Sequence, residues 1–227
     1  MTGFSRYAIY ATFPPGPFDD ALSAWLGWDS LTGREQAHPD LPLPVAEITK
    51  RPRKYGAHGT IKAPFRLADH CTETELREAL CAFCLGQKSF DLHGLEIARL
   101  GQFLALVPAA PCPALDALAA ATVASLDDFR APPDEADLAR RRKSRLTPRQ
   151  DANLTRWGYP HVMEDFRFHI TLTGPLKSEL LPGVEAALTD YLRGFLERPM
   201  RIDALSLMGE NSETGRFHVI DRISLGV

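Results

Sequence analysis

An internal repeat constrains the fold of this chain more than any other feature of its sequence. Both halves show the same predicted order of strand, helix, strand and strand, and in each half the first strand carries a histidine. His58 lies 32 residues before Phe90, and His169 lies 31 residues before Met200. The repeat indicates a duplicated unit, and one copy alone is too small to bury both faces of its sheet.

We therefore predict an α+β fold: two pseudo-symmetric lobes from an internal duplication, each with a small antiparallel sheet and packed helices, around a central cleft. One bilobal domain would comprise a first lobe at about 1–112 and a second at about 161–227. Residues at about 113–160 have no counterpart in the repeat and are predicted to form a helical insertion. The helices of the two copies are expected at about 72–86 and 178–197.

Alternating and aromatic-rich segments predict the strands, and prolines punctuate them. The expected strands are 6–13, 56–67 (stopped by Pro64), 89–101, 102–110, 166–176 (stopped by Pro175), 199–210 and 216–227. A short helix is expected at 18–29. Residues 29–52 are proline-rich and predict an ordered loop with one short strand at Val45–Ile48.

The repeat aligns two short motifs of the form His-x-Thr-apolar: His58-Gly59-Thr60-Ile61 and His169-Ile170-Thr171-Leu172. Alternate residues of a strand share a face, so each motif presents an imidazole beside a hydroxyl. Across a cleft, two such pairs suit in-line displacement at phosphorus. One imidazole would take a proton from water, the other would protonate the leaving oxygen, and the hydroxyls would bind the non-bridging oxygens.

Two structural core histidines are the alternative interpretation. A single His with Thr at the second following position is a weak signal. Two matches at equivalent positions of a repeat are much harder to obtain by chance, which favours the catalytic pair.

The paired motifs in a duplicated α+β frame resemble the two-histidine (2H) phosphoesterases, a superfamily that includes RNA 2′,3′-cyclic phosphodiesterases and RNA-ligase-like proteins. The longer segments HGTIKAPFRL and FRFHITLTGPL are similar to a branch known only as a domain of unknown function, whose members are commonly linked to phosphonate (carbon–phosphorus lyase) gene clusters. The resemblance covers most of the chain.

The resemblance implies that His58 and His169 are the general acid–base pair, that Thr60 and Thr171 bind phosphate, and that no metal or other cofactor is needed. The two histidines are 111 residues apart, more than is expected of the compact RNA-processing members. This spacing argues against an RNA substrate more than against the chemistry.

Four further residues are candidates for substrate binding. Lys62 would share the face of His58 in an unbroken strand, where its ammonium could stabilise phosphate; a strand-end lysine reaching solvent is an equal alternative. Thr173 could extend the hydroxyl row of the second motif, although an ordinary strand threonine is favoured. Arg53 lies just upstream of the first motif.

Tyr7 is the fourth candidate. It and Tyr10 fall on opposite faces of the first strand, so at most one can line the cleft, and core packing is favoured over stacking on a base or sugar.

The run Arg140–Lys143, extended by Arg145 and Arg149, is the densest basic patch, within a predicted basic helical segment at 134–149. Its pattern favours a solvated helix C-terminus. A basic lid that gathers phosphorylated substrate, with Arg156, Trp157 and Tyr159, is the alternative.

Composition limits the function classes. The 26 Lys and Arg against 29 Asp and Glu give a net charge of −3, which argues against a protein that depends on bulk nucleic-acid affinity. Cys81 and Cys84 form a C-x-x-C inside an apolar helical run and, with the other two cysteines, are expected to be buried free thiols. No leader or membrane-spanning segment is visible, so a cytoplasmic, monomeric protein without a membrane partner is expected.

The predicted function is a metal-independent cyclic phosphodiesterase that opens a small cyclic phosphate, with a ribosyl cyclic phosphate of phosphonate catabolism as the substrate that the resemblance favours. An enzyme acting on RNA 2′,3′-cyclic phosphate ends, or an RNA-ligase-like enzyme, is the alternative enzyme class. A non-catalytic module that binds a phosphosugar or nucleotide is a second class, and turnover separates it from the enzymes. A metal-dependent hydrolase is disfavoured because no carboxylates cluster with the histidines.

Overall fold

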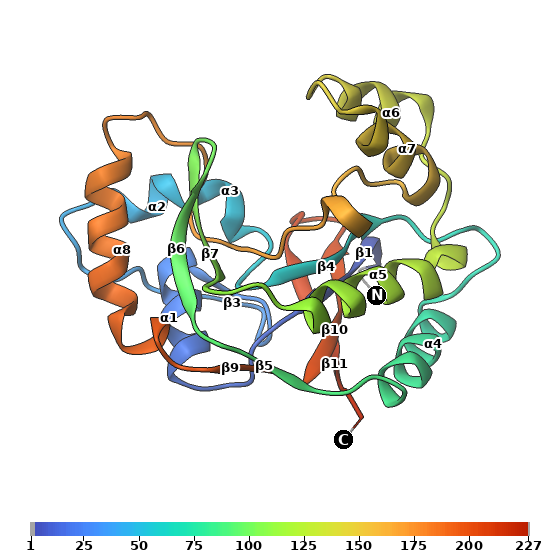
Figure 1. Cartoon of the computed structure of the whole chain (residues 1–227), viewed down its shortest axis with the longest axis horizontal. Coiled ribbons are helices and arrows are strands. Elements are labelled where there is room, and N and C mark those ends of the chain that lie inside the picture. The colour runs from blue at the N-terminus through green and yellow to red at the C-terminus, as the bar shows by residue number, and fades with distance from the viewer. Residues whose placement is uncertain (1–2, 227) are drawn as a thin grey trace.

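The computed structural model describes residues 3–226 and has one large antiparallel sheet at its centre (Figure 1). Residues 1–2 of the predicted first lobe and Val227 of the predicted last strand lie outside the described residues. The strands of the large sheet are β1 Phe4–Ala11, β4 Gly59–Phe65, β6 Leu95–Leu100, β7 Phe103–Pro108, β8 Ile170–Thr171, β10 Ala204–Asn211 and β11 Phe217–Ser224. They lie in the order β11-β10-β1-β4-β8-β7-β6, and every neighbouring pair is antiparallel.

Two small strand pairs complete the β structure: β2 (Trp28–Asp29) with β3 (Arg34–Glu35), and β5 (Phe90–Leu92) with β9 (Met200–Ile202). Equivalent residues of the two repeats meet at two places, where Gly59 pairs with Ile170 and Asp91 pairs with Arg201. The predicted α+β class with antiparallel sheets is confirmed.

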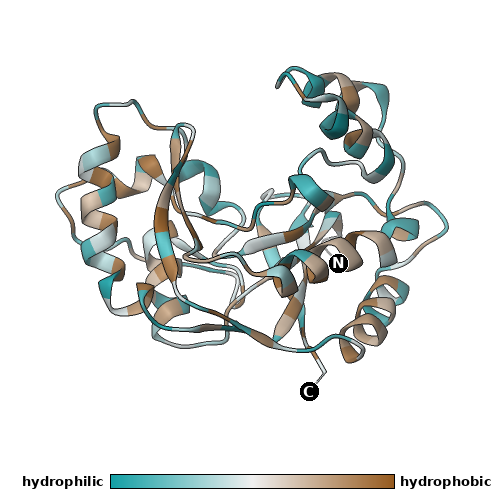
Figure 2. Ribbon diagram, in the orientation of Figure 1, coloured by the Kyte–Doolittle hydropathy of each residue, from teal (hydrophilic) through white to brown (hydrophobic). Residues whose placement is uncertain are grey.

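The helices are α1 Pro17–Leu26, α2 Val45–Ile48, α3 Lys50–Arg53, α4 Glu73–Leu85, α5 Pro113–Ser125, α6 Glu135–Arg142, α7 Pro148–Trp157 and α8 Leu181–Leu196, with single 3-10 turns at Asp127–Phe129 and Met163–Asp165. Thr72 and Glu75 form a reciprocal capping box that begins α4. Helices α5, α6 and α7 confirm that the segment between the repeats is helical. Helix α6 is mostly hydrophilic and has no buried residue (Figure 2).

The two sequence halves exchange strands. Strand β4 of the first half is on the side of the sheet that holds β1, β10 and β11, and β1 is its direct neighbour there. Helix α4 packs on β10 and β11. Strand β8 of the second half lies beside β7 and β6, on which α8 packs. Each side of the sheet therefore takes elements from both sequence halves, 1–112 and 161–227. The two motif strands become direct neighbours at the centre.

Two local predictions are wrong. Val45–Ile48 is the helix α2 rather than a strand, and it buries Val45 and Ile48 against the main core. Strand β4 continues through Pro64 to Phe65. The proline is tolerated because the register of β4 against β1 shifts there, between the pairs Ile9–Lys62 and Tyr7–Phe65, so its missing N–H breaks no regular ladder.

The main core lies between the sheet and its helices, and a second, small apolar cluster lies on the other face of the sheet. Tyr7, Ile9 and Ala11 of β1 belong to the main core, whereas Ala8 and Tyr10 belong to the small cluster. This alternation is the period of two expected of a strand. It means that the even-numbered positions of β1 face the site described next.

Candidate active site

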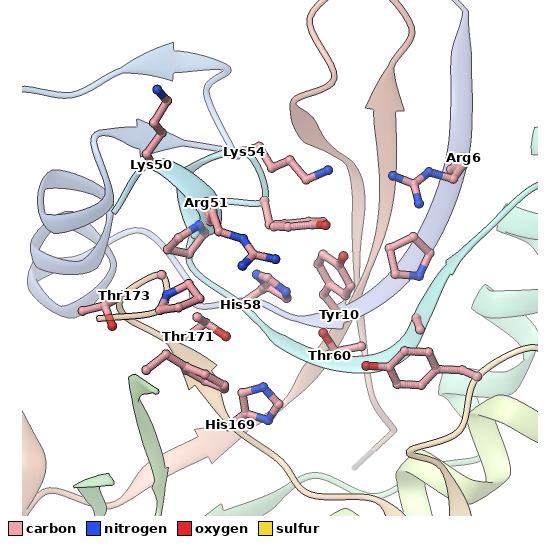
Figure 3. A pocket seen from close by; sticks show the side chains of 18 of the residues that line it. Arg6, Tyr10, Lys50, Arg51, Lys54, His58, Thr60, His169, Thr171 and Thr173 are labelled. Atoms are coloured by element: carbon pink, nitrogen blue, oxygen red, sulfur yellow. The ribbon is translucent and has the colours of Figure 1, made fainter. Parts of the chain in front are cut away.

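The two His-x-Thr motifs lie side by side on β4 and β8. Gly59 is paired with Ile170 in an antiparallel register, so continuing that register sets His58 opposite Thr171 and Thr60 opposite His169. All four side chains line one pocket of about 790 Å³, and Figure 3 shows them gathered at its floor. The structure therefore brings together the four residues singled out from the repeat.

Both imidazoles are held in the same way. Nδ1 of His58 lies 2.9 Å from the carbonyl oxygen of Gly56, and Nδ1 of His169 lies 2.8 Å from that of Arg167. A carbonyl oxygen only accepts, so each Nδ1 carries a proton and donates it. Nε2 is then the free nitrogen of each ring, able to accept a proton in the neutral form or donate one in the cationic form.

Gly56 is needed for the first of these hydrogen bonds. Its φ of +72° is in the left-handed region, and a Cβ there would lie 2.6 Å from Oγ of Ser30. A glycine thus turns the chain so that its carbonyl meets the ring of His58.

Gly59, the middle residue of the first motif, is needed for a different reason. It faces away from the pocket, where a Cβ would lie 2.1 Å from the ring of Phe168. Phe168 is itself buried and directly precedes His169. The absence of a side chain at Gly59 thus lets an aromatic residue of the second motif strand pack directly against the first.

The two histidines differ in their surroundings. The ring of His58 is 9% exposed and stacks on Tyr10, with 3.9 Å between ring centroids and 21° between planes. Burial lowers the pKa of His58 to about 4, because the imidazolium loses its hydration; the carbonyl of Gly56 opposes this shift and His169 adds to it. His169 is half-buried beside Phe103. His58 is therefore neutral at neutral pH.

The threonine hydroxyls of the motifs are available to a ligand. Within residues 3–226, neither Thr60 nor Thr171 uses its side chain in a hydrogen bond to protein. Thr173 also borders the pocket, but its Oγ1 accepts a hydrogen bond from the backbone N–H of Leu104 and the residue is 1% exposed. The favoured interpretation of Thr173 as a structural threonine agrees with this contact.

Lys62 does not lie in this pocket, contrary to the prediction for an unbroken strand. Thr60 of β4 pairs with Tyr10 of β1, and Lys62 pairs with the adjacent Ile9. Ile61 is therefore an extra residue in β4 and forms a β-bulge. The bulge turns Lys62 to the helix side. There its Nζ donates to the carbonyl of Val123 and to Asp127, each at 3.1 Å, and the residue is 3% exposed.

Arg53 and Tyr7 are likewise structural. Arg53 donates to the carbonyl oxygens of Leu26 and Ala46 and thereby ties α3 to the preceding segments. The hydroxyl of Tyr7 donates to Glu73 at the start of α4, at 2.9 Å. Tyr10, on the opposite face of β1, takes the place in the pocket that was considered for Tyr7.

Sequence reasoning missed most of the cations of the pocket. These are Arg6, Lys50, Arg51, Lys54 and Arg141, and no Asp or Glu of the described residues lines it. In Figure 3 the guanidinium of Arg51 points toward His58. Arg6 and Tyr10 share one face of β1, because alternate residues of a strand point the same way. Assigning Tyr10 to the cleft would therefore have indicated Arg6 as well. Arg141 belongs to the basic run, of which it alone borders this pocket.

Residues 3–226 contain neither a candidate metal-binding cluster nor a helix suited to cross a membrane. No three His, Cys, Asp or Glu side chains in this part of the chain are grouped so that they could hold a metal ion. None of its helices combines the length and apolar character that a bilayer requires. Cys71, Cys81, Cys84 and Cys112 are free thiols, as predicted.

Comparisons with known proteins give both relatives and a family. The chain is 35% identical over 215 residues to the ribose 1,5-bisphosphate phosphokinase PhnN of Janthinobacterium sp. (strain Marseille), covering 91% of this chain and 48% of that protein. It is 32% identical over 216 residues to the PhnN of Laribacter hongkongensis (strain HLHK9), covering 94% and 50%. The chain thus spans about half the length of these relatives.

Among solved structures, E. coli LigT complexed with NADP+ matches 99% of both chains with 14% identity and a TM-score of 0.48. The family model described as a protein of unknown function, DUF1045, matches residues 60–218, which include Thr60, His169 and Thr171. This agrees with the expected branch known only as a domain of unknown function. The chain belongs to the DUF1045 family.

Proposed function

We propose that this protein is a cyclic phosphodiesterase that opens a small cyclic phosphate with its own side chains. One observation carries the proposal: two imidazoles with free Nε2 atoms and two threonine hydroxyls that make no hydrogen bond within residues 3–226 meet on adjacent strands. Among these described residues, cations line their pocket and no carboxylate does. Such a pocket favours an anion, and its floor offers both an acid and a base.

In the proposed reaction, neutral His58 accepts a proton on Nε2 from water as the water oxygen bonds to phosphorus. The opposite P–O bond of the ring breaks, and His169, protonated on Nε2, donates that proton to the leaving oxygen. The product is a phosphomonoester with a free hydroxyl. The lowered pKa of His58 supports its role as the base.

The hydroxyls of Thr60 and Thr171 and the guanidinium of Arg51 would bind the non-bridging oxygens. Their charge grows as the fifth bond to phosphorus forms, so donors fixed in place stabilise the transition state more than the substrate. The stacking of Tyr10 on His58 would hold the imidazole in a fixed orientation toward the phosphate.

A ribosyl cyclic phosphate formed during phosphonate breakdown is the substrate we propose. The name of two relatives, ribose 1,5-bisphosphate phosphokinase PhnN, supports a phosphorylated ribose. The kinase activity in that name is not carried over, because the chain spans about half of those proteins. The balanced net charge supports a small substrate over RNA.

The test is ring opening followed by phosphorus NMR. Chelator-treated protein is incubated with ribose 1,2-cyclic phosphate 5-phosphate, with 2′,3′-cyclic nucleotides and with an RNA ending in a cyclic phosphate. His58→Gln and His169→Gln are compared with the wild type, and His70→Gln, an exposed histidine outside the pocket, is the control.

We expect ring opening that survives chelation, is retained in the control and is lost in both pocket variants. The compound whose ring opens fastest identifies the substrate class. If that compound is the RNA, an RNA end replaces the ribosyl cyclic phosphate as the proposed substrate. Binding without product would indicate a phosphosugar- or nucleotide-binding module. Activity equal to wild type in either pocket variant would contradict the mechanism.

A further inference from the structure

Three cations gather in the pocket beyond the histidines. Arg6 comes from β1, Lys54 follows α3, and Arg141 comes from α6. In Figure 3 the side chains of Arg6 and Lys54 reach toward one another near Tyr10, on the other side of His58 from His169. We call Arg6, Lys54 and Arg141 the distal cation cluster.

One carboxylate serves this cluster. Glu210 of β10 is 8% exposed, does not line the pocket, and receives two hydrogen bonds from Arg6, at 2.5 and 2.7 Å. Lys54 Nζ lies 3.8 Å from the same carboxylate. Glu210 thus interacts with both Arg6 and Lys54 without lining the pocket itself. The three cations of the cluster are accompanied by this one negative charge.

Arg141 differs from its neighbours in the basic run. Arg140 pairs with Asp137 of α6, and Arg142 pairs with Asp151 of α7. Arg141 has no carboxylate partner within residues 3–226; its guanidinium lies over the ring of Tyr159, 5.1 Å from the centroid, and is half-buried. An arginine held by an aromatic ring at a pocket wall keeps its donors free for an anion.

The excess of two positive charges matches a phosphomonoester, which carries close to two negative charges at neutral pH. The reacting cyclic phosphate carries one charge and already has Arg51, Thr60 and Thr171 at the pocket floor. The cations of the distal cluster are therefore more than a single diester group requires.

We propose that the distal cation cluster is a second anion site that binds a phosphomonoester carried by the same substrate whose cyclic phosphate lies at the histidines. The proposal rests on the proposed function and narrows the substrate class to doubly phosphorylated compounds. The phosphomonoester takes no part in the chemistry; its binding positions the ring and raises kcat/KM.

The test uses a pair of substrates that differ by one phosphate: adenosine 2′,3′-cyclic phosphate with and without a 5′-phosphate. We expect wild-type protein to have a kcat/KM at least about tenfold higher for the 5′-phosphorylated member, as charge-assisted hydrogen bonds to one more phosphate would give. Arg141→Ala should remove most of this preference, because it should lower kcat/KM for the 5′-phosphorylated member much more than for the other member.

Arg140→Ala is the matched control, because Arg140 is the adjacent residue of α6, is exposed and lies outside this pocket. It should keep the full preference. Arg141→Lys, which preserves the charge, should keep part of it, and Lys54→Gln should lose part of it. A wild type without preference, or an Arg141→Ala variant impaired equally on both substrates, would overturn the proposal.

Binding separates this proposal from the hydrolase proposal. Calorimetric titration of the doubly substituted His58→Gln, His169→Gln protein with the same two compounds needs no turnover. A preference for the 5′-phosphorylated compound that depends on Arg141 supports the second anion site even if wild-type protein hydrolyses neither compound. Equal affinity for the two compounds contradicts it.

Discussion

His58 and His169 donate from Nδ1 to the carbonyl oxygen of the residue two positions earlier in the chain, at 2.9 and 2.8 Å. The shared contact makes the two rings equivalent in tautomer, although they belong to different halves of the repeat. The surroundings of the two rings are different: His58 is buried and stacks on Tyr10, whereas His169 is half-buried. Burial of one imidazole of the duplicated motif thus lowers the pKa of His58.

The first prediction concerns stability against pH. The pKa of His58 is about 4 in the folded protein, below the ordinary 6.5, so unfolding between these pH values takes up a proton. The free energy of unfolding should therefore fall as pH is lowered from about 6.5 to about 4, by up to about 3 kcal/mol from this group.

Urea unfolding of wild type and His58→Gln at several pH values between about 4 and 7.5 measures this slope. The variant should lose part of the wild-type slope, whereas His70→Gln should retain it. Carboxyl groups that titrate in this range affect all three proteins alike. The same slope in wild type and His58→Gln would show that the buried imidazole does not titrate in this way.

The second prediction concerns rate. The pH dependence of kcat/KM reports the free enzyme, and the proposed base has a pKa of about 4. With a 2′,3′-cyclic nucleotide, a diester that keeps one charge over this range, activity should persist to about pH 4.5. An acid limb centred near the ordinary imidazole value of 6.5 would contradict the assignment of His58 as base.

The third prediction concerns the contact between the two motifs. Gly59→Ala would place a Cβ at 2.1 Å from the ring of Phe168, so the strands must shift, and we expect a loss of about 1–3 kcal/mol in unfolding free energy. Phe168→Leu should relieve the clash. A double-mutant cycle measures the coupling, and costs that simply add would show that the ring adjusts elsewhere.

The chemistry-bearing residues could be predicted because they depend only on a repeat and on strand alternation. His58, Thr60, His169 and Thr171 share a face in any strand that stays regular over three residues. The pairing of their strands could not be predicted. Strands β4 and β8 lie in opposite halves of the chain, and local sequence patterns carry no information on pairing between such distant segments.

Lys62 shows where alternation fails as a guide. It lies four residues after His58, and the single extra residue at Ile61 reverses the face on which it points. Arg53 fails for a related reason: the segment Lys50–Arg53 is helical, so Arg51 and Arg53 point in different directions. In both cases the local backbone geometry, a bulge for Lys62 and a short helix for Arg53, sets the direction of the side chain.

The fourth prediction follows from the buried position of Lys62. Lys62→Met should leave kcat/KM within about twofold and change the unfolding free energy by less than about 1 kcal/mol, since Asp127 keeps its ion pair with Arg130. Asp127→Asn should cost more, about 2–4 kcal/mol, because it removes the negative charge that faces the buried ammonium of Lys62. A tenfold or larger loss of kcat/KM in Lys62→Met with unchanged stability would instead place the ammonium in the site.

The last prediction separates three threonines that the sequence makes look alike. Valine has the shape of threonine without its hydroxyl, so Thr60→Val and Thr171→Val should lower kcat/KM by about 10- to 100-fold with little change in Tm. Thr173→Val should do the reverse, because it removes the acceptor of the buried N–H of Leu104: its Tm should fall while its kcat/KM stays within about threefold. Thermal melting and kinetics on one cyclic nucleotide give both readouts. If Thr173→Val lost activity as strongly as the other two at equal Tm, the phosphate would be bound by a row of three hydroxyls, and the second motif would extend further along its strand than the pairing of Thr60 with His169 implies.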